Sequence, residues 1–290
     1  MRVLIASDLS EASDEAVRQG VARAAGGRIG VCHVMPELGT HALLAQQYEE
    51  DLTKQLEVQP RIAEALQGQL ERLAPGTSAQ AEIFIEQGSP YDQILARAEQ
   101  WQADLVAVGT HGRTGLRRML LGSVADQVVR GAHCPVLVAR PQREGAVLTA
   151  TDLTDPALPA IELGVAEAKR TGRKLVVMHA MESREGDAAM GLLGALPALD
   201  TPETSAARRA LARDIIQTAL KRLGAEADVV IAEEDALRET LELAASLPAG
   251  LVVVGSHGRS GLSRVVLGSM VARVLENAPC SVLVARQDAP

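Results

Sequence analysis

Short apolar runs alternate with longer amphipathic segments along the whole chain. The runs have the continuous hydrophobicity of strands that are buried on both faces of a parallel sheet. The predicted strands of the first half are residues 2–8, 29–35, 81–86, 105–108 and 134–139. Strands that alternate with helices predict a parallel sheet covered on both faces, with right-handed crossovers. The pattern therefore indicates an α/β fold.

The segments between the strands carry apolar residues at helical spacing, with the first helix capped by Ser10. The predicted buried stripes are Ala16, Val17, Gly20 and Ala24 in the first helix, Ile62, Leu66, Leu70 and Leu73 in a long helix within 36–76, and Ile215, Ala219 and Leu223 in the second half. Each stripe predicts the helix face that packs on the sheet.

The pattern then restarts in the second half of the chain. Residues 109–140 recur at 255–286, where 18 of 32 positions are identical. The repeated strands are predicted at 145–152, 175–180, 229–232, 251–254 and 281–285. Such self-similarity predicts two copies of one domain. We place them at residues 1–141 and 145–287, with a short polar linker between them.

Each copy carries the same glycine-rich loop after its fourth strand, with the spacing G-x2-G-x9-G-S. The loop residues are Gly109, Gly112, Gly122 and Ser123 in the first half and Gly255, Gly258, Gly268 and Ser269 in the second. We expect these glycines to let the backbone approach a ligand and adopt positive φ. The helix that begins at Gly-Ser offers unpaired amides and a partial positive charge. The motif therefore predicts a phosphate site, present twice.

Other residues are predicted to meet the loop at the same edge of each sheet. Asp8 and Asp152 each end a first strand, and open parallel sheets bind ligands beyond the carboxyl ends of their strands. The site is neither a P-loop, because both loops lack its lysine, nor a dinucleotide fingerprint, because no GxGxxG follows the first strand.

This doubled motif resembles the universal stress protein family in its tandem two-domain form, over essentially the whole chain. The resemblance implies two Rossmann-like (adenine nucleotide alpha hydrolase-like) domains, each with a five-stranded parallel sheet of order 3-2-1-4-5 and helices on both faces. It also implies an ATP site that uses the glycine loop. Both motifs are intact, which favours the ATP-binding branch of the family.

The resemblance carries roles onto single residues of the first half. Gly109 would lie against the ribose, Gly112 near the phosphates, and Asp8 would face the adenosine. The end of the second strand near Val34 would pack on the adenine. Phosphate oxygens would be held by Gly122, Ser123 and the amide of Val124. The matching residues of the second half are Asp152, Ala180, Gly255, Gly258, Gly268, Ser269 and Met270.

Further candidates lie beside these residues. Ser7 and Thr151 precede the two aspartates, and Arg113 and Arg259 could touch phosphate or face solvent. His111 could act as a general base, but nothing pairs it with a nucleophile, so we expect it to pack in the loop. The second half has Glu234-Asp-Ala236 where the first has Gly88-Ser-Pro90. These acids disfavour phosphate, so we expect the first site to bind better.

Composition excludes several classes of partner. The formal net charge of −8 and the four aromatic residues argue against nucleic acid. No apolar run approaches the ~20 residues that span a bilayer. The first run meets a carboxylate too early for a secretory signal, and the three cysteines lack CxxC spacing. We therefore expect a cytoplasmic protein with reduced thiols.

The function that the sequence favours is an ATP-binding stress-response regulator or nucleotide-state sensor. No Walker lysine or positioned base is visible, so ATP hydrolysis should be slow at most. Mg²⁺ would arrive with the nucleotide, because no side-chain set has metal-ligand spacing. The alternatives are a nucleotide-independent interaction module and an adenylating enzyme of related fold. We expect the two domains to pair internally through their fifth strands; a homodimer and an unidentified protein partner stay open.

Overall fold

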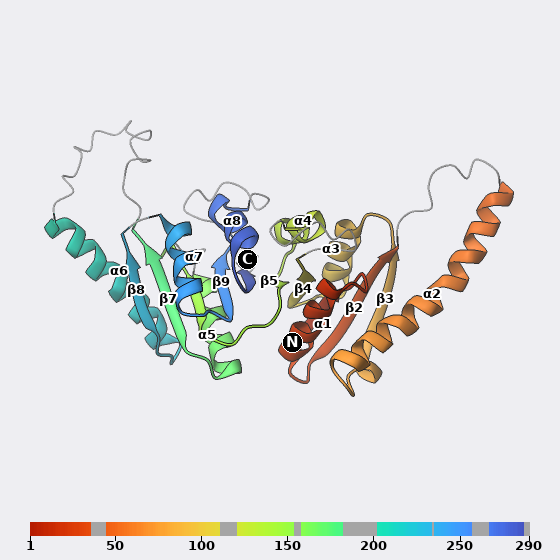
Figure 1. Cartoon of the computed structure of the whole chain (residues 1–290), viewed down its shortest axis with the longest axis horizontal. Helices are drawn as coiled ribbons and strands as arrows, with labels where there is room; N and C mark the ends of the chain where they lie inside the picture. Colours follow the sequence, from red (N-terminus) through yellow and green to blue (C-terminus); the bar gives the residue numbers. More distant parts are fainter. Residues whose placement is uncertain are drawn as a thin grey trace. The chain divides into compact units, whose positions relative to one another are not determined.

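The computed structural model describes residues 1–35, 45–110, 121–153, 158–181, 202–233, 235–256 and 267–286. The chain divides into two compact units between Gln142 and Arg143. Each unit holds a five-stranded parallel sheet with helices packed against it (Figure 1). The predicted α/β class is therefore confirmed.

The first unit has the strand order β3-β2-β1-β4-β5. Its strands are β1 (Arg2–Ala6), β2 (Arg28–Met35), β3 (Ala81–Gln87), β4 (Leu105–Gly109) and β5 (Val136–Ala139). Its helices are α1 (Glu11–Ala24), α2 (Ala45–Leu73), α3 (Pro90–Gln100) and α4 (Ser123–Gly131), with a 3-10 turn η1 (Ser78–Gln80). This is the 3-2-1-4-5 order that the family resemblance implied.

The second unit repeats this arrangement with the order β8-β7-β6-β9-β10. Its strands are β6 (Val147–Ala150), β7 (Leu175–Ala180), β8 (Asp228–Ala232), β9 (Leu251–Gly255) and β10 (Ser281–Ala285). Its helices are α5 (Leu158–Thr171), α6 (Pro202–Arg222), α7 (Ala236–Ser246) and α8 (Ser269–Asn277). The pairing of the two fifth strands stays a prediction.

The helical stripes of the first unit lie where the sequence predicted them. Ser10 is the N-cap of α1 and accepts a hydrogen bond from the amide of Ser13. The predicted residues of α1, namely Ala16, Val17, Gly20 and Ala24, are all buried. In α2, Leu66 and Leu70 are fully buried, whereas Ile62 and Leu73, the ends of the predicted stripe, are half-buried. These contacts hold α1 and α2 against the sheet that carries the predicted site.

The stripe predicted for α6 is wrong by one position. Ile215 is 38% exposed, whereas the buried face consists of Ala212, Ile216 and Leu220. The helix has two adjacent apolar stripes at the same i, i+4 spacing, and only one of them can face the sheet. Periodicity alone cannot choose between them, because both satisfy the helical repeat.

A glycine in the first helix of each unit approaches the first strand closely. A Cβ on Gly20 would lie 2.8 Å from Cγ1 of Ile5, and one on Gly164 would lie 2.0 Å from Oγ1 of Thr149. Thr149 is fully buried, and its hydroxyl has no hydrogen-bond partner among the described residues. A buried hydroxyl without a partner costs about 1–3 kcal/mol. The second unit therefore carries a destabilising group where the first carries an alkyl chain.

We expect Thr149→Val to raise the free energy of unfolding of the second unit by about 1 kcal/mol, because it removes the unsatisfied hydroxyl. Thermal unfolding followed by circular dichroism measures the change. Thr149→Ser is the matched control, since it keeps the hydroxyl and removes the methyl group. A valine variant less stable than the parent would show that the hydroxyl stabilises the fold.

Candidate functional site

A tight turn after β1 holds the first predicted site residues at the carboxyl edge of the sheet. The amide of Ser7 donates to the carbonyl of Cys32 at 3.0 Å, which continues the sheet by one residue. Leu9 has a left-handed φ of 64°, and its amide donates to Oγ of Ser7 at 3.1 Å. Oδ1 of Asp8 accepts from the amide and hydroxyl of Ser10. The helix cap and the site residues are therefore parts of one turn.

The second unit has the same turn after β6. Leu153 has a φ of 61°, and its amide donates to Oγ1 of Thr151 at 3.2 Å. In each unit a buried histidine, His33 or His179, contacts the carbonyl of Ser7 or Thr151 through Nδ1 at 2.8 Å. A carbonyl can only accept, so Nδ1 carries the proton in both rings. These bonds tie the ends of the first two strands together, as expected for structural histidines.

The helix after each glycine loop begins without a side-chain cap. The amide of Gly122 donates to the carbonyl of Thr110 at 2.7 Å, and Gly122 is the N-cap of α4. The amide of Gly268 donates in the same way to Ser256, at 3.2 Å, before α8. Neither N-cap supplies a side-chain acceptor to the first turn. The amides in the first turn of each helix therefore have no side-chain acceptor at the N-cap, which is the arrangement that favours an anion.

The turn after β1 and the start of α4 line one pocket of about 250 Å³. Seven of its residues are ones that the sequence predicted, namely Ser7, Asp8, Val34, Gly109, Gly122, Ser123 and Val124. The other lining residues are Ala6, Ser13, Cys32, Pro90, Ile94, Val108, Thr110 and Ala125. The structure thus brings together residues from β1, β2, β4, α1, α3 and α4.

The remaining predicted residues fall into two groups. His111, Gly112, Arg113, Gly258 and Arg259 lie outside the described residues. In the second unit, Thr151 and Asp152 follow β6, Ala180 ends β7, Gly255 ends β9, Gly268 precedes α8, and Ser269 and Met270 begin it. These are the positions that correspond to the lining of the first pocket.

The expectation of positive φ at the motif glycines is wrong for the four that the structure describes. None of Gly109, Gly122, Gly255 and Gly268 is among the residues with positive φ. A Cβ on Gly109 would instead lie 2.6 Å from the carbonyl oxygen of Ala12 in α1. Glycine is needed at position 109 because the end of β4 touches the helix backbone. The first glycine of the motif therefore serves the packing of β4 against α1.

Eight lining residues were not among the predicted site residues: Ala6, Ser13, Cys32, Pro90, Ile94, Val108, Thr110 and Ala125. Burial, with a smaller contribution from the charge of Glu86, raises the pKa of the Cys32 thiol to about 12. This cysteine stays protonated near neutral pH, so it lines the pocket as a small apolar group. Ser13 could have been found from its place in the first turn of α1, three residues after the cap.

The two units differ at the start of α3 and α7. Gly88 has a φ of 127°, and Ser89 makes no side-chain cap bond to α3. At the corresponding place in the second unit, Oδ1 of Asp235 accepts from the amide of Arg238 at 2.7 Å and caps α7. A carboxylate thus stands at the edge where the first unit has an uncharged residue.

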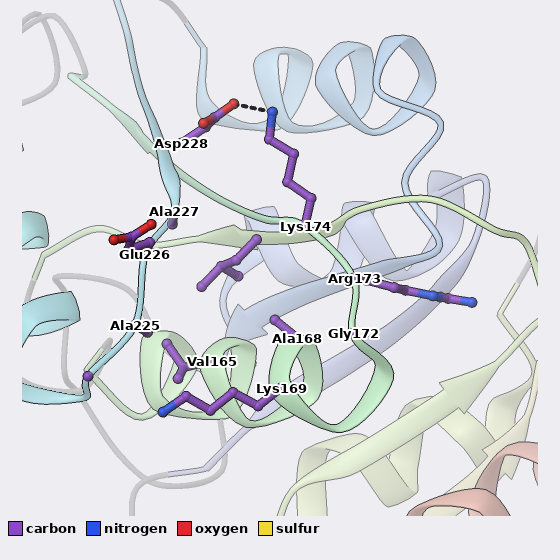
Figure 2. Close-up of a pocket in the computed structure, with 12 residues that line it drawn as sticks. Val165, Ala168, Lys169, Gly172, Arg173, Lys174, Ala225, Glu226, Ala227 and Asp228 are labelled. Carbon is purple, nitrogen blue, oxygen red and sulfur yellow. Dashed lines mark ion pairs between the residues drawn. The ribbon is translucent and has the colours of Figure 1, made fainter.

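Figure 2 shows a second hollow, of about 560 Å³, at the amino ends of β7 and β8 in the second unit. Lys174 forms an ion pair with Asp228 across it, at 2.5 Å. The ammonium of Lys169 donates to the carbonyl of Leu223 at 2.8 Å, and Arg173 points away from both lysines. The three cations therefore do not converge on one anion.

Two kinds of feature are absent from the part of the chain that the structure describes. No group of three or more His, Cys, Asp or Glu side chains among the described residues is arranged to hold a metal ion. Among the same residues, no helix is both long and apolar enough to cross a bilayer. All three cysteines are buried and form no disulfide bond.

Comparisons with known proteins agree with the geometry. The model of the universal stress protein family matches residues 1–140 and 145–286. The universal stress protein Rv2005c of Mycobacterium tuberculosis is 34% identical over 194 residues, which are 64% of this chain. The match spans 63% of that relative, less than two thirds of its length.

A solved structure that covers nearly the whole chain shows the same fold. A universal stress protein from Archaeoglobus fulgidus DSM 4304 has a TM-score of 0.67 and 22% identity, covering 98% of both chains. A universal stress protein solved in complex with cAMP covers 49% of this chain, with a TM-score of 0.35 and 26% identity. We take that ligand as a property of that protein. Because the family model matches nearly the whole length in two copies, this chain belongs to the universal stress protein family.

Proposed function

We propose that this protein binds ATP and acts as a stress-response regulator whose partner reads the nucleotide state. The observation that carries the proposal is the pocket of the first unit. It joins seven residues that the glycine motif and the strand ends predicted, from β2, β4, the start of α4 and the turn after β1. Adenosine would occupy the pocket between Asp8, Val34 and Gly109.

The triphosphate would lie at the start of α4. Its oxygens would meet the amides of Ser123 and Val124, which no N-cap side chain occupies. The enclosed volume of about 250 Å³ falls just below the ~300–1,000 Å³ of most small-molecule sites. It therefore suits the nucleoside part, with the phosphates extending along the helix start. Mg²⁺ would be brought by these phosphates.

Nucleotide hydrolysis is proposed to be slow. The motif has no lysine to reach the terminal phosphates, and the one thiol in the pocket, that of Cys32, is protonated at neutral pH because its pKa is raised to about 12. A bound nucleotide then acts through its different affinity for two conformations of the protein. We propose the second unit as the weaker site, because Asp235 brings a carboxylate to its edge.

Isothermal titration calorimetry with ATP and ADP tests the function. The purified protein is expected to bind ATP with a dissociation constant well below ~1 mM. Gly122→Val combined with Gly268→Val should abolish binding, because each new side chain would stand between the ligand and a helix start. Gly68→Ala, in open space on α2, is the control and should bind as the parent does.

Absence of any ATP or ADP affinity tighter than the millimolar range would overturn the proposal. It would favour the alternative of a nucleotide-independent interaction module. Pyrophosphate release with a candidate substrate would instead support the adenylating enzyme. The single variants Gly122→Val and Gly268→Val report which unit binds.

A further inference from the structure

A buried amide connects the pocket of the first unit to α2. The side chain of Gln69 is only 4% exposed, and its Oε1 accepts from the hydroxyl of Ser7 at 2.7 Å. Its Nε2 donates to Oδ1 of Asp14 at 2.7 Å and to Oγ of Ser13 at 3.3 Å. Arg72 donates to both carboxylate oxygens of Asp14 at 3.0 Å. Two of these residues, Ser7 and Ser13, line the pocket.

The charge of Asp14 fixes which way the amide points. Burial by itself would raise the pKa of Asp14, but hydrogen bonds from Arg72 and Gln69 bring it below its usual 3.8. The group is therefore a carboxylate at neutral pH and can only accept hydrogen bonds. Nε2 of Gln69 must face it, so Oε1 must face Ser7. The single hydroxyl proton of Ser7 is then directed at Gln69.

The proton of Ser13 is also directed away from the pocket. Its hydroxyl donates to the carbonyl of Ser10 at 2.8 Å, a shorter contact than the 3.2 Å between the hydroxyl oxygens of Ser7 and Ser13. A hydroxyl has one proton to donate and two lone pairs that accept. Both serines therefore donate their hydroxyl protons inside the protein, Ser7 to Gln69 and Ser13 to the carbonyl of Ser10. Each oxygen also accepts one bond, from the amide of Leu9 or from Nε2 of Gln69, so one lone pair of each is left for a ligand.

We propose that Gln69 is a specificity-determining residue of the first site, because it makes the wall formed by Ser7 and Ser13 a hydrogen-bond acceptor only. The wall selects a ligand group that donates, which in a nucleotide is a sugar hydroxyl or the exocyclic amine. Gln69 acts through the serines and is a positioning residue. This inference rests on the proposed nucleotide binding and names the chemistry that the site selects.

Among the residues that the structure describes, the second unit repeats one hydroxyl of this network, that of Thr151. Ala157 takes the sequence position of Ser13, 144 residues later, so one hydroxyl is missing. The buried side chains that the structure describes on α6 are the apolar Ala212, Ile216 and Leu220. No buried amide corresponds to Gln69 on that described surface. The selection is therefore specific to the first unit, and a test needs the second site silenced.

The test measures ATP, 2′-deoxy-ATP, 3′-deoxy-ATP and ITP by calorimetry, in the full chain carrying Gly268→Val. Each deoxy analogue lacks one sugar hydroxyl of ATP. ITP has a carbonyl oxygen in place of the exocyclic amine. At least one analogue is expected to bind about tenfold or more weakly than ATP, because it loses the hydrogen bond to the remaining lone pair of a serine oxygen. That analogue identifies the donor group.

Two variants then locate the origin of this discrimination. Ser7→Ala removes an acceptor oxygen, and Gln69→Met removes the amide at nearly constant length. Both should reduce the ratio between ATP and the discriminated analogue to about threefold or less. The double variant Asp14→Asn with Gln69→Glu exchanges acid and amide, so Ser7 again donates to residue 69. It should restore the ratio, which a merely structural role would not do.

Each outcome decides between the two proposals. ATP binding with no analogue weaker by more than about threefold would overturn this inference and leave the proposed function standing. Unchanged discrimination in both Ser7→Ala and Gln69→Met would overturn it as well. No ATP binding at all would overturn both. Fluorescence of Trp101, buried in the first unit, checks that each variant is folded; should Gln69→Met unfold, the ratio measured in Ser7→Ala decides.

Discussion

Gly109→Ala is expected to lower the free energy of unfolding of the first unit by about 3 kcal/mol or more. The added Cβ would lie 2.6 Å from the carbonyl oxygen of Ala12 and 3.1 Å from the amide nitrogen of Ser13. These are backbone atoms of α1, which cannot rotate away as a side-chain end can. Relief requires α1 to move off β4, and α1 packs on both β1 and β4. One added methyl group at position 109 is therefore expected to destabilise the whole first unit.

Urea unfolding followed by the fluorescence of Trp101 measures this effect. Trp101 is the one tryptophan of the chain and is buried in the first unit against Phe84. The signal therefore reports on that unit. Gly68→Ala is the matched control: its Cβ meets nothing within 4 Å, and alanine in a helix interior should stabilise by about 0.5–1 kcal/mol. Equal stability of the Gly109→Ala protein and the parent would contradict the packing argument.

Gly164→Ala is expected to destabilise the second unit by about 2–3 kcal/mol, because its Cβ would overlap Oγ1 of Thr149 at 2.0 Å. The contact is with a side chain, so a second change can relieve it. Thr149→Ala removes the hydroxyl and methyl group and opens space for the new Cβ. The double variant should therefore lose less stability than the two single losses together, by about 1–2 kcal/mol.

Far-UV circular dichroism follows this cycle, because all four aromatic residues lie before position 102 and fluorescence would miss the second unit. Thr149→Val is the control for volume, since valine carries two methyl groups on Cβ where threonine carries a hydroxyl and a methyl group. It should give no relief of the Gly164→Ala defect. Additive losses in the Thr149→Ala cycle would show that α5 and β6 do not meet as the structure has them.

The hydrophobic pattern determined the architecture of this protein to a large extent. Continuous apolar runs between amphipathic segments define parallel strands and covering helices, and the copy of 109–140 at 255–286 defines a repeated unit. Strand ends follow from where these runs stop, so Asp8 and Gly109 could be placed at one edge. The strand order came from the family resemblance carried by the glycine motif, because hydrophobic periodicity carries no information about which strands pair.

Other features were decided by tertiary structure alone. The choice between the two stripes of α6 depends on which one meets the sheet, and the need for glycine at 109 depends on the backbone of α1. In the sequence, Gln69 is only a polar residue beside Leu70, 62 positions from Ser7, and its hydrogen bond to Ser7 appears only in the fold. A sequence records periodicity along one element, whereas proton direction and close backbone contact arise between elements that meet only in the fold. The sequence by itself thus determined the repeat and the edge where the proposed site lies, and the folded contacts decided how the side chains at that edge are hydrogen-bonded.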